Sequence, residues 1–159
     1  MRHLLFLILF GVASQSITAL ADEPTFSIGV GSYDRSGDEP MLNLQIEGSS
    51  IENLWSIRPT LSFLADTEQS FYLGIGLTKY FKIDPLWRLG IGVHAGWYDA
   101  DEPSRDLGNS LEFYTRLSVG YAINSEQHIE LAYGHISNAD LGDTNPGGET
   151  LSINWVRAF

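Results

Sequence analysis

The sequence contains no cysteine, so disulfide bonds and thiolate chemistry are both excluded. Basic residues are also scarce, with nine Lys and Arg against twenty Asp and Glu. A nucleic-acid partner is therefore excluded, because phosphate binding requires clustered positive charge. After residue 21, no apolar stretch approaches the roughly 20 residues that a transmembrane helix needs.

The beginning of the chain has the pattern of a secretory signal peptide. Arg2 gives a short basic start, residues 4–12 form an apolar run, and residues 19–21 form an A-x-A cleavage site. The apolar run is too short for a membrane anchor, which requires about 20 residues. We therefore predict a signal peptide over residues 1–21 and one mature domain over residues 22–159.

The mature part has the pattern of successive β-strands. Apolar and polar side chains alternate with a period of two, and Gly, Asp, Asn and Pro gather at the breaks between strands. The predicted strands are 25–33, 41–48, 54–64, 70–82, 86–98, 109–123, 127–137 and 149–159.

The alternation indicates a membrane barrel rather than a soluble sandwich. Over residues 87–97 the odd positions are apolar, whereas the even positions hold Arg88, His94 and glycines. Outer-membrane barrels have this pattern, because apolar side chains face lipid and small or charged ones fill the lumen. Every backbone polar group in lipid must be paired, so the sheet has to close. We therefore predict an all-β fold, an eight-stranded antiparallel transmembrane β-barrel.

Two further features predict the outer membrane of a Gram-negative bacterium. Aromatic residues near strand ends suit the girdles at the membrane boundary: Trp55, Trp87, Trp97, Tyr98 and Trp155. The last strand ends at Phe159, although Arg157 interrupts its apolar face. A terminal Phe on an alternating strand resembles the signal that the outer-membrane assembly machinery recognises, so this machinery is an expected partner.

The lengths of the breaks predict the topology, with both termini in the periplasm. The outer connections are 34–40, 65–69, 99–108 and 138–148, and the periplasmic ones are 49–53, 83–85 and 124–126. Pro59 cannot donate a ladder hydrogen bond, so a bulge is expected there. A charge network is predicted in the lumen: Glu47, Arg58, Arg88, His94, Glu112, Arg116 and Glu130. His128, at the periplasmic end, is expected to be solvated.

A candidate catalytic group lies at the outer end of the last two strands. His135 and Ser137 both have the lipid-facing parity of their strand, and an imidazole can reach a hydroxyl two residues away. Glu149 has the same parity in the next strand, so a hairpin would bring it beside His135. The pattern predicts a nucleophile, a base and an orienting carboxylate at the membrane boundary. Geometry alone equally admits three polar side chains that only mark the headgroup level.

Residues 135–141, which have the pattern H-x-S-N-A-x-L, followed by Glu149, resemble the signature of the lipid A 3-O-deacylases of the PagL family. The resemblance covers the C-terminal third of the chain and extends weakly to residues 107–113 and Arg116. The N-terminal half is similar to the family only in its barrel alternation.

The resemblance implies an outer-membrane esterase that hydrolyses the 3-O-linked acyl chain of lipid A in lipopolysaccharide. It makes Ser137 the nucleophile, His135 the general base and Glu149 the group that orients the imidazole. The side-chain amide of Asn138 and a backbone N–H near Asp140 would then bind the oxyanion, although the family usually has Gly where Asp140 stands. Glycines would keep the adjoining loop adaptable: Gly142, Gly147 and Gly148.

Two other functions remain open at this stage. A non-enzymatic small barrel with a structural or adhesive role explains everything except the spacing of the four candidate residues. A phospholipid esterase is a third interpretation, but such barrels are larger and need calcium, and the sequence has no calcium-binding pattern. No metal or organic cofactor is expected, and the sequence is compatible with a monomer as well as a homodimer.

Overall fold

A computed structural model describes residues 23–34 and 38–159 of the chain. The predicted signal peptide lies outside the described residues. The described residues fold into eight strands: β1 (Thr25–Asp34), β2 (Asp38–Glu47), β3 (Arg58–Asp66), β4 (Ser70–Lys82), β5 (Trp87–Ala100), β6 (Leu111–Ala122), β7 (Gln127–Ser137) and β8 (Gly148–Ala158). Two short 3-10 helices, η2 (Glu52–Leu54) and η3 (Pro103–Arg105), lie in the connections.

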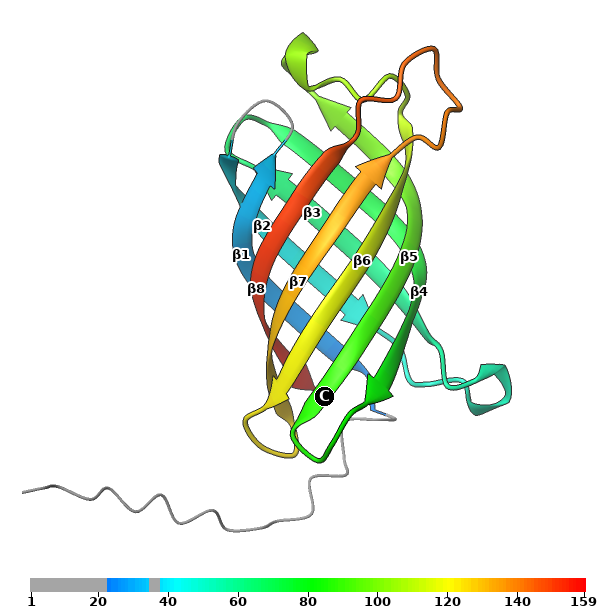
Figure 1. Ribbon diagram of the computed structural model, residues 1–159, viewed down its shortest axis with the longest axis vertical. Coiled ribbons are helices and arrows are strands. Elements are labelled where there is room, and N and C mark those ends of the chain that lie inside the picture. The colour runs from blue at the N-terminus through cyan, green and yellow to red at the C-terminus, as the bar shows by residue number, and fades with distance from the viewer. Residues whose placement is uncertain (1–22, 35–37) are drawn as a thin grey trace, which may run out of the picture.

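The strands form one closed antiparallel barrel, as the sequence predicts. Each strand pairs with its neighbours in the sequence, and β1 pairs with β8 to close the sheet (Figure 1). The C-terminus lies at the same end as the β2–β3, β4–β5 and β6–β7 connections. We call this end periplasmic and the opposite end outer, following the usual topology of such barrels. Neither 3-10 helix in the described part is long and apolar enough to cross a bilayer.

The two faces of the wall follow the predicted parity. In β5, Val93 is 52% exposed, whereas His94 beside it is only 4% exposed. Large apolar side chains therefore cover the outside of the barrel, where they face lipid. The outer half of the lumen is filled by packed apolar and aromatic side chains: Tyr33, Met41, Leu64, Tyr72, Tyr98, Leu107, Tyr114 and Ile136.

The rest of the lumen holds the predicted charge network, with some differences. Glu130 pairs with both Arg88 and Arg116, and Arg58 pairs with Glu47 at 3.1 Å. Tyr80, which was not expected there, donates its hydroxyl to Glu47 at 2.7 Å. Buried opposite charges of this kind offset each other's desolvation cost.

Three residues have surroundings that differ from those predicted for them. Glu112 is fully buried, and neither of its carboxylate oxygens has a hydrogen-bond partner in the described part of the chain. His94 stacks on Tyr114 instead of joining an ion pair. The expectation that His128 is solvated was wrong, because its even position turns it into the lumen, where it is 6% exposed.

The third strand and its preceding loop also differ from the prediction. β3 begins at Arg58 rather than at residue 54, so Trp55 lies in the β2–β3 connection and not in a strand-end girdle. Pro59 pairs in register with Leu77, and no bulge forms. Its carbonyl accepts from Gly48 beyond the end of β2, so the missing N–H interrupts no bond between the strands. Tyr98 was also wrongly expected in a girdle, because it is buried in the lumen.

Candidate active site

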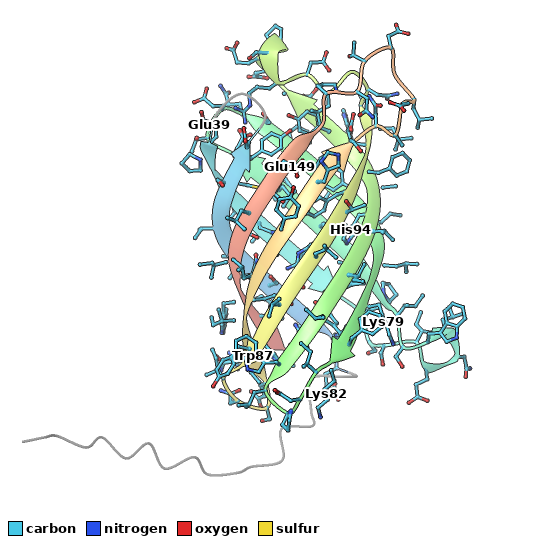
Figure 2. All side chains as sticks on the ribbon, viewed as in Figure 1. Glu39, Lys79, Lys82, Trp87, His94 and Glu149 are labelled. Carbon is cyan, nitrogen blue, oxygen red and sulfur yellow. The ribbon has the colours of Figure 1, made fainter. Side chains whose placement is uncertain are left out.

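The hairpin of β7 and β8 brings two candidate residues together at the outer end of the barrel. His135 is the direct cross-strand partner of Glu149, and Figure 2 shows Glu149 near the outer end of the wall. Ser137 is the last residue of β7, two positions beyond His135 on the same face. All three side chains are partly exposed on the side that faces lipid.

The imidazole and the carboxylate form a close pair. His135 Nδ1 lies 2.8 Å from Glu149 Oε1, and the two side chains are 42% and 43% exposed. A carboxylate only accepts hydrogen bonds, so Nδ1 carries the proton and donates it to Glu149. In the neutral ring this leaves Nε2 with a free lone pair, which is the arrangement that a general base requires.

Tyr133, which has the lipid-facing parity of β7, completes this pair. The hydroxyl of Tyr133 donates to Glu149 Oε2, so each oxygen of the carboxylate has its own donor. Tyr133 lies opposite Leu151, two residues from Glu149 on the same face. The sequence could have indicated this contact, because Tyr133 and Glu149 occupy diagonal positions on paired strands. Long side chains at diagonal positions of an antiparallel pair are within reach of each other.

Gly147 leaves space beside the imidazole. A Cβ added at Gly147 would lie 2.8 Å from His135 Cε1 and 3.3 Å from His135 Nε2. Its φ of +67° also belongs to the left-handed region, which side chains rarely adopt. A glycine at position 147 therefore keeps the Nε2 edge of the imidazole free of a neighbouring side chain. The Ser137 hydroxyl itself makes no hydrogen bond within the described residues.

Asn138 is placed differently from the expected oxyanion donor. Its side chain is fully buried, and its amide nitrogen donates to Leu107 O at 2.8 Å and to Thr144 O at 2.7 Å. Its backbone N–H donates to Asn145 Oδ1 at 3.1 Å. Both amide hydrogens are thus engaged by backbone carbonyls, so Asn138 fastens the β5–β6 connection to the β7–β8 connection.

The residues after Asn138 form a left-handed turn. Ala139 and Asp140 have φ angles of +52° and +62°, and the N–H of Leu141 donates to Asn138 O at 3.1 Å. Glycine adopts this backbone conformation without strain, and Asp is one of the few side chains that tolerate it. The carboxylate of Asp140 accepts from Asn145 Nδ2 at 3.0 Å. Within the described residues, the Asp140 N–H donates to no protein acceptor.

The β5–β6 connection supports this turn from the mouth of the barrel. Arg105, in η3, is buried, pairs with Asp66 and donates from Nε to Ser70 Oγ at 2.8 Å. Its carbonyl accepts from Tyr98 Oη at 3.0 Å. These contacts fix Leu107, which is fully buried and whose carbonyl holds Asn138.

No group of three or more His, Cys, Asp or Glu residues in the described ranges is arranged to hold a metal ion. The side chains that the site presents are a hydroxyl, an imidazole and a carboxylate. Together these side chains can transfer an acyl group through a covalent intermediate.

Comparisons with known proteins agree with the fold and identify a family. The barrel is similar to the crystal structure of the outer membrane enzyme PagL, with a TM-score of 0.61, 20% identity, and coverage of 85% of this chain and 99% of that chain. It is also similar to a de novo designed transmembrane β-barrel (TM-score 0.64, 9% identity, coverage 87% and 96%). For Neisserial surface protein A, the TM-score is 0.60 at 14% identity, with coverage of 89% and 99%. At such identities the structural likeness establishes the fold alone.

A search of curated protein sequences finds no match. The sequence profile of the family described as Lipid A 3-O-deacylase (PagL) matches residues 32–157, which is most of the mature domain. The chain therefore belongs to the lipid A 3-O-deacylase (PagL) family of outer-membrane ester hydrolases.

Proposed function

We propose that this chain hydrolyses the 3-O-linked acyl ester of lipid A through a triad of Ser137, His135 and Glu149. The observation that carries the proposal is the 2.8 Å pair of His135 Nδ1 and Glu149 Oε1 on the lipid-facing side of the outer end. Towards the middle of the two strands that face is apolar, and Leu131 and Ile153 are more than half exposed.

A carboxylate on the lipid-facing surface is costly and needs a reason to be there. Charged side chains facing lipid in a barrel destabilise it by an amount that depends on depth. Glu149 offsets this cost with two donors, His135 and Tyr133, at the level of the membrane boundary. Both side chains lie outside the packed lumen and are partly exposed, so the pair does not serve the core, and this supports a role in chemistry.

The reaction follows from the free nitrogen of the imidazole. His135 Nε2 takes the proton of Ser137 Oγ, and the oxygen forms a bond to the ester carbonyl carbon. The tetrahedral intermediate then collapses, the bond from this carbon to the sugar oxygen breaks, and the imidazolium returns the proton to the leaving alcohol. Water, deprotonated by His135, attacks the acyl-enzyme in the same way and releases the fatty acid. Glu149 stabilises the imidazolium in both halves of the reaction.

The oxyanion is assigned to the left-handed turn after Ser137. The Asp140 N–H donates to no group of the described protein and is available to the developing negative charge. Donors of this kind typically contribute about 3–4 kcal/mol to the transition state. Asn138 acts here as a positioning residue, because its amide fixes the turn to Leu107 and Thr144. The carboxylate of Asp140 accepts a hydrogen bond from Asn145 in the loop. The carboxylate and the backbone N–H of Asp140 therefore have separate roles.

The location of the site suits lipid A as a substrate. The acyl esters of lipid A lie between its sugar headgroup and its hydrocarbon chains. The triad lies at the outer end of β7 and β8, above the lipid-facing apolar stripe of those strands. An ester in the outer leaflet can therefore reach Ser137 while its acyl chain stays beside the barrel wall.

The experiment that tests this function compares the folded parent barrel with Ser137→Ala in detergent micelles containing lipid A. We expect mass spectrometry to show loss of one 3-O-linked acyl chain with the parent and none with the variant. The heat-modifiable gel shift of a folded barrel serves as the control for both proteins. Hydrolysis at the parent rate by folded Ser137→Ala would exclude the triad.

The same assay separates the alternatives. A non-enzymatic barrel would release no fatty acid from lipid A in either form. A phospholipid esterase would release fatty acid from phosphatidylethanolamine micelles and leave lipid A intact. The lipid A hydrolase that we propose would release fatty acid from lipid A and leave phosphatidylethanolamine intact.

A further inference from the structure

The connection between β2 and β3, residues 48–57, forms a projecting arm at the periplasmic end. Its stem continues the pairing of the two strands, with Gly48 N donating to Pro59 O and Ile51 N donating to Ile57 O, both at 2.9 Å. Figure 1 shows that the arm runs sideways from the barrel wall, above the level of the β4–β5 and β6–β7 turns. We refer to residues 48–57 as the β2–β3 arm.

The arm lies on the outside of the barrel rather than beneath it. Lys79 has the lipid-facing parity of Leu77 and Phe81 in β4, and its ammonium donates to the carbonyl of Trp55 at the tip of the arm. The same ammonium lies 5.8 Å from the centre of the Phe81 ring. A lysine on the lipid-facing side requires such partners, because an unpaired charge is costly there. The tip therefore lies beside the lipid-facing wall of β4.

The tip of the arm carries apolar side chains that contact little of the protein. Trp55 is 86% exposed and Leu54 is 52% exposed, and η2 contains no buried residue. Trp55 and Ser56 have φ angles of +56° and +53°, a conformation that is costly for residues other than glycine. An exposed Trp held on a strained turn is a poor arrangement in water, because it leaves a large apolar surface hydrated.

The arm itself carries one exposed acidic side chain, Glu52, and both lysines at this end come from β4. Lys79 and Lys82, the two lysines of the sequence, both lie at the periplasmic end of β4, and Lys79 contacts the arm (Figure 2). Lys82 is exposed and can meet lipid phosphates while its alkyl stem stays in the apolar layer. The apolar side chains of the arm continue the lipid-facing band of the barrel, whose Phe81 and Ile83 are also exposed at this end.

We propose that the β2–β3 arm lies in the inner leaflet of the outer membrane, with Leu54 and Trp55 inserted at the boundary between phospholipid headgroups and acyl chains. Tryptophan prefers this boundary, because its ring is apolar and its N–H can reach polar groups. The arm thereby widens the footprint of a narrow barrel on the periplasmic side. The proposal is independent of the reaction at the outer end.

The test uses the absence of cysteine from the chain to place one environment-sensitive label. The full mature barrel with Leu54→Cys, labelled with bimane, is folded into phosphatidylethanolamine and phosphatidylglycerol vesicles. The vesicles carry a nitroxide on the headgroup, at a shallow acyl position or at a deep acyl position. We expect the shallow acyl nitroxide to quench the label most strongly. Ile51→Cys provides a second site on the same arm.

The matched control is Glu126→Cys in the β6–β7 turn, which is exposed at the same end of the barrel. The arm label should be quenched several-fold more strongly than this control. Equal, weak quenching at both sites would place the arm in periplasmic water and overturn the proposal. Energy transfer between labelled arms at low protein density would show that a second copy covers the arm, which would overturn it as well. The gel shift of each labelled protein verifies folding.

Discussion

Strand β7 contributes to two charged clusters, one on each face of the barrel wall. Glu130 faces the lumen, where it is 1% exposed and pairs with Arg88 and Arg116. His135, five residues further along, faces lipid and pairs with Glu149 while both side chains stay more than two-fifths exposed. The strand parity alone separates the two clusters, because successive side chains point to opposite faces.

The difference between the clusters suits only the outer one to the catalytic role that we propose. The lumen cluster combines permanently charged guanidinium groups with a carboxylate, and no substrate can reach it through the packed outer half of the barrel. The outer cluster contains an imidazole whose Nδ1 pairs with Glu149, so that Nε2 is left to take a proton in the proposed reaction. Similar electrostatic pairing therefore supports the fold on one face and is available for chemistry on the other.

The largest effect of breaking the outer cluster is expected on catalysis. Glu149→Gln keeps the shape of the side chain but weakens the stabilisation of the imidazolium. We expect kcat on lipid A to fall on the order of 10³-fold, a smaller loss than that of Ser137→Ala. Asp143→Asn makes the same change of charge in the adjoining loop, where the side chain is exposed, and should leave kcat unchanged. An unaltered rate for Glu149→Gln would remove this residue from the mechanism.

Breaking the lumen cluster should instead affect stability. Glu130→Gln leaves Arg88 and Arg116 buried without their carboxylate, and removal of one partner from a buried ion pair typically costs about 3–5 kcal/mol. Urea unfolding of the barrel in lipid vesicles measures this loss. Hydrolysis per folded molecule should stay at the parent level, because Glu130 does not contact the triad. Glu126→Gln is the control, since an exposed turn residue usually changes stability by less than about 0.5 kcal/mol.

The sequence predicted the features that depend on strand parity. Val93 and His94 fall on the expected faces, and Glu149 lies beside His135 because a hairpin preserves the pairing of its two strands. Local patterns were less informative about where strands end. Trp55 suits a strand, yet β3 begins only at Arg58, because the chain between β2 and β3 forms the arm instead.

Contacts between distant loops could not be predicted from one sequence. Asn138 was expected to bind the oxyanion, and nothing near it in the sequence indicates that Leu107 accepts its amide hydrogen. That contact depends on how Arg105 closes the mouth of the barrel with Asp66, which is 39 residues away in the sequence. The role of Tyr133 was missed for a different reason. Its lipid-facing parity suggested an apolar stripe, although the diagonal position of Glu149 gives its hydroxyl a partner.

The smallest expected effect concerns this tyrosine. Tyr133→Phe keeps the ring on the lipid-facing side and removes only the donor to Glu149 Oε2, so Glu149 retains His135 as its single partner. Exposure to solvent weakens this hydrogen bond to a charged group, so we expect kcat to fall only about tenfold. KM should stay constant, because the hydroxyl that is lost contacts Glu149 and not the substrate.

A double-mutant cycle decides whether Tyr133 acts through the carboxylate. If it does, adding Tyr133→Phe to Glu149→Gln should cost much less than the same change costs in the parent, because the two residues then share one interaction. The control is Tyr121→Phe, which removes a hydroxyl from another lipid-facing tyrosine, one with 42% exposure against 50% for Tyr133. Tyr121 packs against Trp87 near the periplasmic end, so this change should leave kcat at the parent value. Fully additive losses in the cycle would show that Tyr133 affects the reaction by another route, and the carboxylate would then be oriented by His135 alone.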